Sequence, residues 1–219
     1  MFQYIQGIFR PHHFHDIIEC LAAALEAKDL YTSGHSSRVG DMSFELGRAM
    51  GLKGSELETI HIAAHLHDIG KMGIPENILN KSGKLLPHEW AEIQRHPEIG
   101  CKILSKSKKL KKIAEIVLYH HERWDGRGYP HGLREDRIPL GSRIIGVTDA
   151  IDAITSVRPY RNAMSWEECR EEILANKGIQ FDPVAVETLE KLWKRWEVRW
   201  QESQKDNKEF KLKALRQLI

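Results

Sequence analysis

An adjacent histidine and aspartate, His67 and Asp68, stand in the segment HDIGK at the end of a predicted helix. A neutral imidazole and a carboxylate are both ligands for divalent iron, manganese or zinc. Adjacent residues on a helix point about 100° apart. The pair could therefore grip different sides of one metal ion, or the carboxylate could bridge two. Because such dipeptides also arise by chance, the pair alone is a weak indication of a metal site.

Further histidines and aspartates could join this pair, namely His35, His96, His120, His121, Asp149 and Asp152. His120 and His121 form a second adjacent pair, which a glycine-rich segment follows. Asp149 and Asp152 share one face of an otherwise apolar predicted helix, where a buried carboxylate needs a cation or a hydrogen-bond donor beside it. Each of these residues alone would more often be an ordinary core or surface residue. The prediction of a metal site therefore depends on their joint occurrence.

The elements that must bring these residues together are predicted to be helices almost throughout. Apolar residues recur at helical spacing, without strand alternation, over about residues 16–28, 34–50, 55–68, 87–96, 98–105, 110–120 and 140–155, with two more helices after Ser165 and Asp182. We therefore predict an all-α fold, a single compact helical bundle with an extra C-terminal helix.

Local signals mark several ends of these helices. The predicted N-terminal caps are Thr32 or Ser33, Ser55 with Glu58, Ser165 with Glu168, and Asp182 before Pro183. Segments 70–75 and 122–139 are rich in glycine and proline and are predicted to be loops. A loop as long as the second one is usually functional in a compact domain.

Composition favours one soluble globular domain. Lys and Arg number 33 against 31 Asp and Glu, a net charge of +2, which gives no general attraction to a nucleic acid polymer or an anionic membrane. No apolar run approaches a membrane span of about 20 residues, and three widely spaced cysteines suit a reducing, cytoplasmic location. We predict an N-terminal extension or linker remnant over residues 1–15, the domain over 16–200, and a charged helical tail over 201–219.

Six stretches of the chain resemble the HD-GYP domain, a branch of the HD superfamily of metal-dependent phosphohydrolases. They are YTSGHSSRV (31–39), HDIGKMGIP (67–75), RHPEIG (95–100), HHERWDGRGYP (120–130), RIIGVTDAIDAITSVRPYR (143–161) and QFDP (180–183), in the family's order. The resemblance covers about residues 16–195. It implies an HD-domain bundle that hydrolyses the bacterial messenger cyclic di-GMP to linear pGpG, and in some members to GMP.

The resemblance also implies a set of metal ligands, which are His35, His67, Asp68, His96, His120, His121 and Asp149. Asp68 is the expected bridging carboxylate, and iron or manganese are the common metals of the family. Two metal ions can supply a bridging hydroxide as the nucleophile and bind phosphate oxygens. Some members with three metals carry a glutamate four residues before the first histidine. Tyr31 occupies that position here, which favours two metals over three.

Other residues are implied to handle the substrate. Lys71 is expected to bind the scissile phosphate or to protonate the leaving group. Arg158 and Arg161 match positions that hold a phosphate or a guanine edge, for which the guanidinium fork is suited. Asp29 and Asp152 are candidates for orienting water or the ligand imidazoles.

Several alternatives stay open. The substrate could be a mixed cyclic GMP-AMP or another phosphoester, or the protein could be a catalytically silent effector that senses a nucleotide or docks on a partner. The filled ligand positions favour an enzyme. The helix bearing Trp193, Trp196 and Trp200 packs in the core or forms a homodimer interface, and Gly128-Tyr129-Pro130 is either structural or a partner contact. His61 and His65 match no family ligand and are interpreted as structural or exposed.

Overall fold

A computed structural model describes residues 11–29, 34–156, 163–199 and 201, and within these ranges all regular elements are helical. The α-helices are α1 (Pro11–Lys28), α2 (His35–Ala49), α3 (Gly54–His65), α4 (Glu76–Leu79), α5 (Pro87–Ile93), α6 (His96–Leu104), α7 (Lys111–Leu118), α8 (Leu140–Thr155), α9 (Trp166–Ala175) and α10 (Pro183–Glu190). Short 3-10 helices cover Ile69–Gly73 (η2), Lys108–Leu110 (η3) and Glu135–Arg137 (η4). The prediction of an all-α fold is confirmed.

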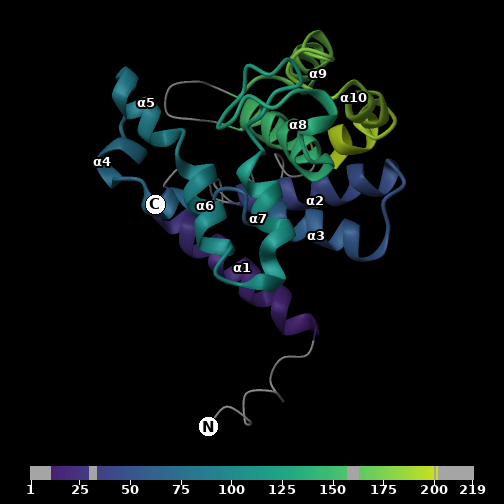
Figure 1. The fold of residues 1–219 in the computed structure, drawn as a ribbon. Helices are drawn as coiled ribbons and strands as arrows, with labels where there is room; N and C mark the ends of the chain where they lie inside the picture. The colour runs from purple at the N-terminus through teal and green to yellow at the C-terminus, as the bar shows by residue number, and fades with distance from the viewer. Residues whose placement is uncertain (1–10, 30–33, 157–162, 200, 202–219) are drawn as a thin grey trace, which may run out of the picture.

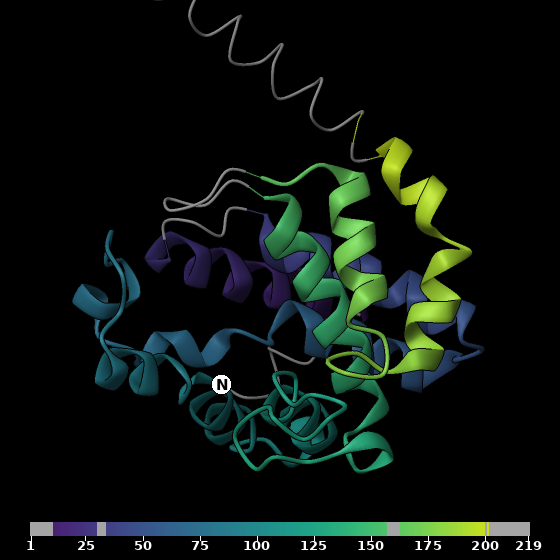
Figure 2. The ribbon, with the colours of Figure 1, turned by 90° about the horizontal axis from the view of Figure 1, so that it is seen from above.

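The helices are arranged in layers (Figure 1). In that view α8, α9 and α10 form the upper part, α2, α3, α6 and α7 lie below them, and α1 runs beneath. Seen from above, α8 and α9 run side by side (Figure 2). Helix α8 also contacts α2, α3 and α7, so it links the two layers.

The core explains why α8 is so apolar on most of its faces. Ile144, Ile145, Val147 and Ile151 of this helix are all fully buried. Each such side chain stabilises the fold by about 1.5–3 kcal/mol relative to its exposed state. The helix can therefore hold Asp149 and Asp152 at fixed positions between the layers.

The capping predictions had mixed outcomes. The Ser165–Glu168 capping box is confirmed, because the Glu168 amide donates to Ser165 Oγ at 3.2 Å and the Ser165 amide donates to Glu168 Oε2 at 2.7 Å. Asp182 caps α10 as predicted, since its Oδ1 accepts from the Val184 amide at 2.7 Å.

Two other helices begin differently from the prediction. Helix α3 begins one residue earlier than its predicted Ser55 cap, at Gly54, and its N-cap Lys53 makes no side-chain cap bond, so this predicted cap is wrong. Helix α2 begins directly after Gly34, whose φ of 69° suits glycine, and the predicted caps Thr32 and Ser33 lie outside the described residues. Its free amides are satisfied by a carboxylate from another helix. Local spacing does not reveal such a partner.

The C-terminal tryptophans contribute to the core. Trp193 and Trp196 are buried, and the Trp193 ring lies against Trp166 with centroids 4.7 Å apart. The Trp196 indole donates to Glu45 Oε2 at 2.6 Å. These two side chains therefore face the bundle interior, whereas Trp200 and most of the predicted tail lie outside the described residues.

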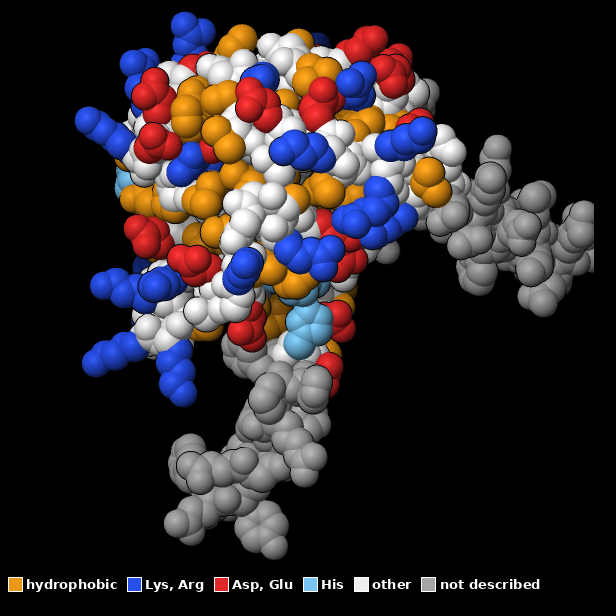
Figure 3. Space-filling model, turned by 90° about the vertical axis from the view of Figure 1, so that its right-hand side faces the viewer, with side chains coloured by type: hydrophobic (Ala, Val, Ile, Leu, Met, Phe, Trp, Pro, Cys, Tyr) orange, Lys and Arg blue, Asp and Glu red, His pale blue; other side chains and the backbone are white. Residues whose placement is uncertain are grey.

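The outer surface carries both signs of charge. On the face shown in Figure 3, basic and acidic side chains are interspersed with hydrophobic ones. Among the described helices, none is long and apolar enough to cross a membrane.

Candidate metal centre

The ends of four helices and the middle of a fifth bring the predicted ligands to one place. His35 is the first residue of α2 and His96 the first of α6, whereas His67 and His120 follow the ends of α3 and α7. Asp149 comes from the middle of α8. The described side chains that could hold a metal fall into three overlapping groups, and within each group one atom per residue lies within 4.8 Å of the others. The groups are His35, His67 and Asp149; His67, Asp68 and His120; and His96, His120 and His121.

Glycine at position 70 allows η2 and α6 to pack closely. A Cβ atom built on Gly70 would lie 1.8 Å from the His96 carbonyl oxygen, so no other residue fits without moving α6. Segment 70–75 was predicted to be a loop, but Ile69–Gly73 forms the 3-10 helix η2. The close packing of η2 on α6 places Asp68 beside His96.

Three imidazoles are oriented by their own helices. Nδ1 of His67 bonds the Ala64 carbonyl at 2.6 Å, Nδ1 of His96 the Ile93 carbonyl at 2.8 Å, and Nδ1 of His120 the Val117 carbonyl at 2.6 Å. A carbonyl oxygen can only accept a hydrogen bond, so each Nδ1 must carry the ring proton. Nε2 of each ring then presents a lone pair to the centre, as a metal-ligating histidine does.

The His96 and His120 rings meet through these unprotonated nitrogens. Their Nε2 atoms lie 3.2 Å apart, with no proton left to place between them. Two lone pairs at this distance repel each other unless a cation lies between them. The donor set therefore fits a divalent metal ion better than it fits a hydrogen-bonded network.

Asp68 lies between the two halves of the centre. Its Oδ1 is 3.3 Å from His96 Nε2, while its Oδ2 is 3.5 Å from His67 Nε2 and 3.7 Å from His35 Nε2. One carboxylate oxygen thus faces each side. Such a placement suits a carboxylate that two metal ions share.

Burial sets the protonation states in this centre. It lowers the pKa of His120 and His121 well below the ordinary value, and the neighbouring imidazoles lower it further. Burial alone would raise the pKa of Asp68, but the Lys71 ammonium and the nearby histidines hold it well below its usual range. The His120 and His121 rings are then neutral and Asp68 is ionised at neutral pH, and these are the forms that bind metal.

His35 is held differently from the other histidines. Its Nδ1 donates to Asp152 Oδ2 at 2.7 Å, and its Nε2 lies 3.5 Å from Asp149 Oδ1. Burial alone would lower the His35 pKa, but the Asp152 hydrogen bond and the nearby carboxylates raise it above the ordinary value. Arg38, which the sequence analysis missed, also donates to Asp152. The position of Arg38, one helical turn after His35, was the sequence feature that could have indicated this contact.

Lys71 is enclosed by two carboxylates. Its ammonium lies 2.7 Å from Asp68 Oδ2 and 2.9 Å from Asp29 Oδ2. Burial alone would lower the Lys71 pKa, but the charges of Asp68 and Asp29 raise it. Lys71 therefore stays positively charged beside the centre, and the sequence-predicted Asp29 contacts Lys71 directly.

The Gly128-Tyr129-Pro130 segment packs against the histidine pair. A Cβ atom on Gly128 would lie 2.5 Å from the His121 carbonyl oxygen, and the Tyr129 amide donates to that oxygen at 3.2 Å. The Tyr129 ring lies over His121 with centroids 4.9 Å apart. This segment therefore forms a wall beside His121.

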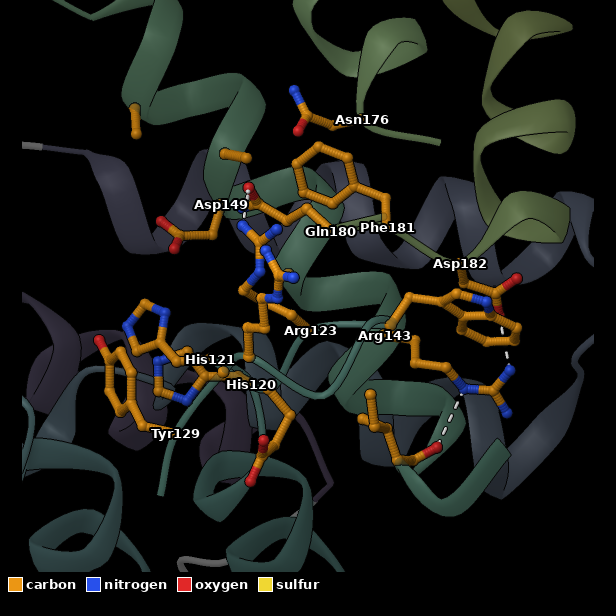
Figure 4. Close-up of a pocket in the computed structure, with 18 of the residues that line it drawn as sticks. His120, His121, Arg123, Tyr129, Arg143, Asp149, Asn176, Gln180, Phe181 and Asp182 are labelled. Atoms are coloured by element: carbon orange, nitrogen blue, oxygen red, sulfur yellow. Dashed lines mark hydrogen bonds and ion pairs between the residues drawn. The ribbon is translucent and has the colours of Figure 1, made fainter. Parts of the chain in front are cut away.

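A cavity of about 700 Å³ opens beside the centre. Figure 4 shows His120, His121 and Asp149 at one side of it, Arg143 and Asp182 at the other, and Arg123 between them. Arg123 Nη1 donates to Gln180 Oε1 at 2.8 Å, and Arg143 Nη1 lies 2.6 Å from Asp182 Oδ2. Neither arginine was predicted from the sequence to bind substrate. The arginines that were predicted to do so, Arg158 and Arg161, lie outside the described residues, as does Tyr31.

His61 and His65 take no part in this centre. Their Nε2 atoms are 3.1 Å apart, and both rings contact His15 of α1 at a centroid distance of 5.4 Å. Burial and, to a lesser extent, the neighbouring imidazoles lower the pKa of His65 to about 4. The interpretation of His61 and His65 as structural agrees with these contacts.

The metal-free protein is expected to lose stability on mild acidification. The folded-state pKa of His65, about 4, lies below the ordinary 6.5, so the unfolded chain takes up protons first as the pH falls. The contribution of neutral His65 to the free energy of unfolding is therefore full above about pH 6.5 and is lost as the pH falls towards 4. We expect the free energy of unfolding in urea with chelator to fall by roughly 1–2 kcal/mol between pH 7 and 5. His65→Gln should flatten this pH dependence, whereas His88→Gln, at an exposed position, should not. The same pH dependence of the free energy of unfolding in the wild type and both variants would refute the prediction.

Comparison with known proteins identifies the fold family. A family model described as HD domain matches residues 19–184. The chain belongs to the HD domain family. This HD domain resembles the crystal structure of a cyclic GMP-AMP-specific phosphodiesterase of Vibrio cholerae, with a TM-score of 0.62 and 21% sequence identity. The match covers 80% of this chain and 48% of the other. At that identity the likeness shows the fold.

Two curated relatives are closer in sequence to this HD domain. A cyclic di-GMP phosphodiesterase of Thermotoga maritima is 44% identical over 181 residues, 82% of this chain and 49% of the relative. The 3'3'-cGAMP-specific phosphodiesterase 2 of Vibrio cholerae is 43% identical over 180 residues, 81% and 34% of the two chains. The chain thus spans half or less of these relatives. The name of the Thermotoga relative matches the expectation of cyclic di-GMP hydrolysis, and the name of the Vibrio relative matches the alternative of a mixed cyclic GMP-AMP.

Proposed function

We propose that this HD domain is a metal-dependent phosphodiesterase that hydrolyses cyclic di-GMP to pGpG, GMP or both. The observation that carries the proposal is the pair of facing Nε2 atoms of His96 and His120, 3.2 Å apart, beside the Asp68 carboxylate. A centre built in this way needs a cation. Iron and manganese are the metals we favour, because nitrogen and carboxylate donors suit both.

The geometry supports a division of the ligands between two metal ions. His35, His67 and Asp149 would hold one, and His96, His120 and His121 the other. Asp68 would be shared, because its two oxygens face the two sets. When bound, the ions would activate water and neutralise the phosphate. We propose two ions and not three, because Tyr31 occupies the position of the glutamate that some three-metal members carry.

Lys71 would contribute a fixed positive charge. Its raised pKa means that the ammonium gives up its proton reluctantly. We therefore favour electrostatic binding of the scissile phosphate over proton donation to the leaving group. Asp29 would hold this ammonium, and Asp152 would fix the His35 ring, both through the contacts described above.

The cavity suits a dinucleotide. Its volume of about 700 Å³ falls within the range of about 300–1,000 Å³ that is typical of small-molecule sites. Arg123 and Arg143 line it at increasing distance from the histidines (Figure 4), where a phosphate or a guanine edge could meet a guanidinium. Arg158 and Arg161 remain proposed contributors by their sequence positions.

A mixed cyclic GMP-AMP is the second candidate substrate, because one relative at 43% identity is named for that specificity. We expect the manganese- or iron-loaded, reduced protein to hydrolyse cyclic di-GMP faster than 3'3'-cGAMP or cyclic di-AMP, with kcat/KM measured for each by product chromatography. A higher kcat/KM for 3'3'-cGAMP would transfer the proposal to that substrate. Binding without turnover of any of the three would favour the silent effector instead.

The remaining predictions have no support in the described contacts. Burial of Trp193 and Trp196 removes them as interface residues, so a homodimer would need other contacts of the C-terminal helix. A partner contact at Gly128-Tyr129-Pro130 and a cytoplasmic location stay predictions. For the Tyr129 segment we favour another role, which is to hold the His121 ring in place through the Tyr129 ring.

A further inference from the structure

The last turn of α1 reaches the helix end that carries His35. Both oxygens of the Glu26 carboxylate accept backbone hydrogen bonds there, Oε2 from the Gly34 amide at 2.7 Å and Oε1 from the Ser36 amide at 3.1 Å. His35 lies between the two amides that Glu26 holds. A helix N-terminus has free amides and a partial positive charge, so a carboxylate is a strong partner for it.

The same turn of α1 reaches the helix that carries Lys71. The Lys28 ammonium donates to three backbone carbonyls at the end of η2, those of Lys71 at 3.2 Å, Met72 at 2.8 Å and Ile74 at 2.9 Å. The carbonyls at a helix C-terminus lack partners within the helix and attract a cation. Lys28 therefore caps η2, which begins directly after Asp68.

Lys71 is consequently held at both ends by Lys28, the last residue of α1, and by Asp29, which follows it. Lys28 binds its backbone carbonyl, and Asp29 binds its ammonium at 2.9 Å. Glu26 and Lys28 both lie in the last turn of α1. This one turn therefore contacts the backbone on both sides of His35 and the backbone of Lys71.

We propose that Glu26 and Lys28 are positioning residues, Glu26 for His35 and Lys28 for Lys71. The proposal rests on the function proposed above, because His35 and Lys71 matter only if the centre binds metal and phosphate. Residues that orient metal ligands and catalytic groups commonly change affinity or activity by about 10–100-fold when they are removed. Their effects should also disappear once the residue that they position is gone.

Metal affinity tests the role of Glu26 without any substrate. We expect Glu26→Ala to raise the Kd for Mn²⁺, measured by calorimetry on metal-free protein, by about 10-fold. Glu26→Gln, which keeps one acceptor oxygen, should fall between this variant and the wild type. An exposed carboxylate on the same helix, changed in Asp16→Ala, is the matched control and should leave the Kd unchanged. A folded Glu26→Ala or Glu26→Gln protein with the wild-type Kd would overturn the role of Glu26.

A double-mutant cycle tests the role of Lys28. We expect Lys28→Met to lower kcat on cyclic di-GMP by about 10-fold, with KM changed less and with Lys28→Arg restoring most of the loss. In a Lys71→Met background, Lys28→Met should cause no further loss, because its effect passes through Lys71. Exposed Lys84→Met is the matched control. Losses that multiply in the double variant would show a general structural effect and overturn the proposal.

These experiments separate the two proposals. If cyclic di-GMP is not hydrolysed, the same cycle is measured on the generic phosphodiester bis(p-nitrophenyl) phosphate, which needs no nucleotide pocket. The Mn²⁺ titration of Glu26→Ala needs no turnover at all. A wild-type protein that binds Mn²⁺ tightly and a Glu26→Ala protein that does not would support positioning even if the substrate assignment failed.

Discussion

Asp68→Ala is expected to lower hydrolysis of cyclic di-GMP by about 10³-fold or more and to reduce the metal content of the purified protein. Asp68 is buried between the two histidine groups and offers one oxygen to each, so its loss would remove a ligand from both proposed metal ions. A metal centre contributes several kcal/mol to the stabilisation of the transition state. Initial rates under manganese saturation, together with elemental analysis, would measure both effects.

The matched control for this substitution is Asp16→Ala. Asp16 is an exposed carboxylate of α1 with no place in the centre, so the rate and the metal content should match those of the wild type. The Asp68→Ala protein must retain the helical circular dichroism of the wild type for the comparison to hold. An Asp68→Ala protein that keeps more than about a tenth of the wild-type rate would contradict the bridging role.

Lys71→Met is expected to lower kcat by about 10²–10³-fold while the bound metal is retained. The ammonium lies between Asp68 and Asp29 and keeps its charge, so the substitution would remove a cation from the place where the phosphate charge develops. Because Lys71 donates no ligand atom to the metal groups, elemental analysis should give the wild-type stoichiometry. Steady-state kinetics with Lys84→Met as the control would measure the effect.

The Lys71→Arg variant distinguishes the two roles considered for Lys71. If Lys71 is a cationic phosphate contact, Lys71→Arg keeps much of the activity, and the alkaline limb of its kcat–pH profile lies where that of the wild type does. A proton donor predicts that Lys71→Arg is as inactive as Lys71→Met, since a guanidinium does not release its proton. Equal inactivity of the two variants would therefore reverse our preference.

The sequence predicted the helices well because their apolar spacing is local information. Helix α8 has the predicted bounds, and Asp182 and Ser165 cap their helices as local motifs do. The failures involve partners that are distant in the chain. The first amides of α2 bond to the Glu26 carboxylate of another helix, and Gly70 of η2 packs on the His96 carbonyl of α6.

The same distinction applies to the candidate site. Histidines and aspartates could be selected by residue type and by their family motif, and the structure brings all seven proposed ligands together. Glu26 and Lys28 lie outside the family stretches, and Arg38 is marked only by its place one turn after His35. Their roles depend on which carboxylate, carbonyl or amide the fold places opposite them, and a single sequence does not contain that information.

The most direct test of the metal centre is a titration of the metal-free, reduced protein with Mn²⁺ or Fe²⁺ while cyclic di-GMP hydrolysis is followed by chromatography. We predict that pGpG or GMP appears only with metal and that the rate saturates near two equivalents per chain. Full hydrolysis by the metal-free protein in excess chelator, or no product at any metal loading, would contradict the central claim.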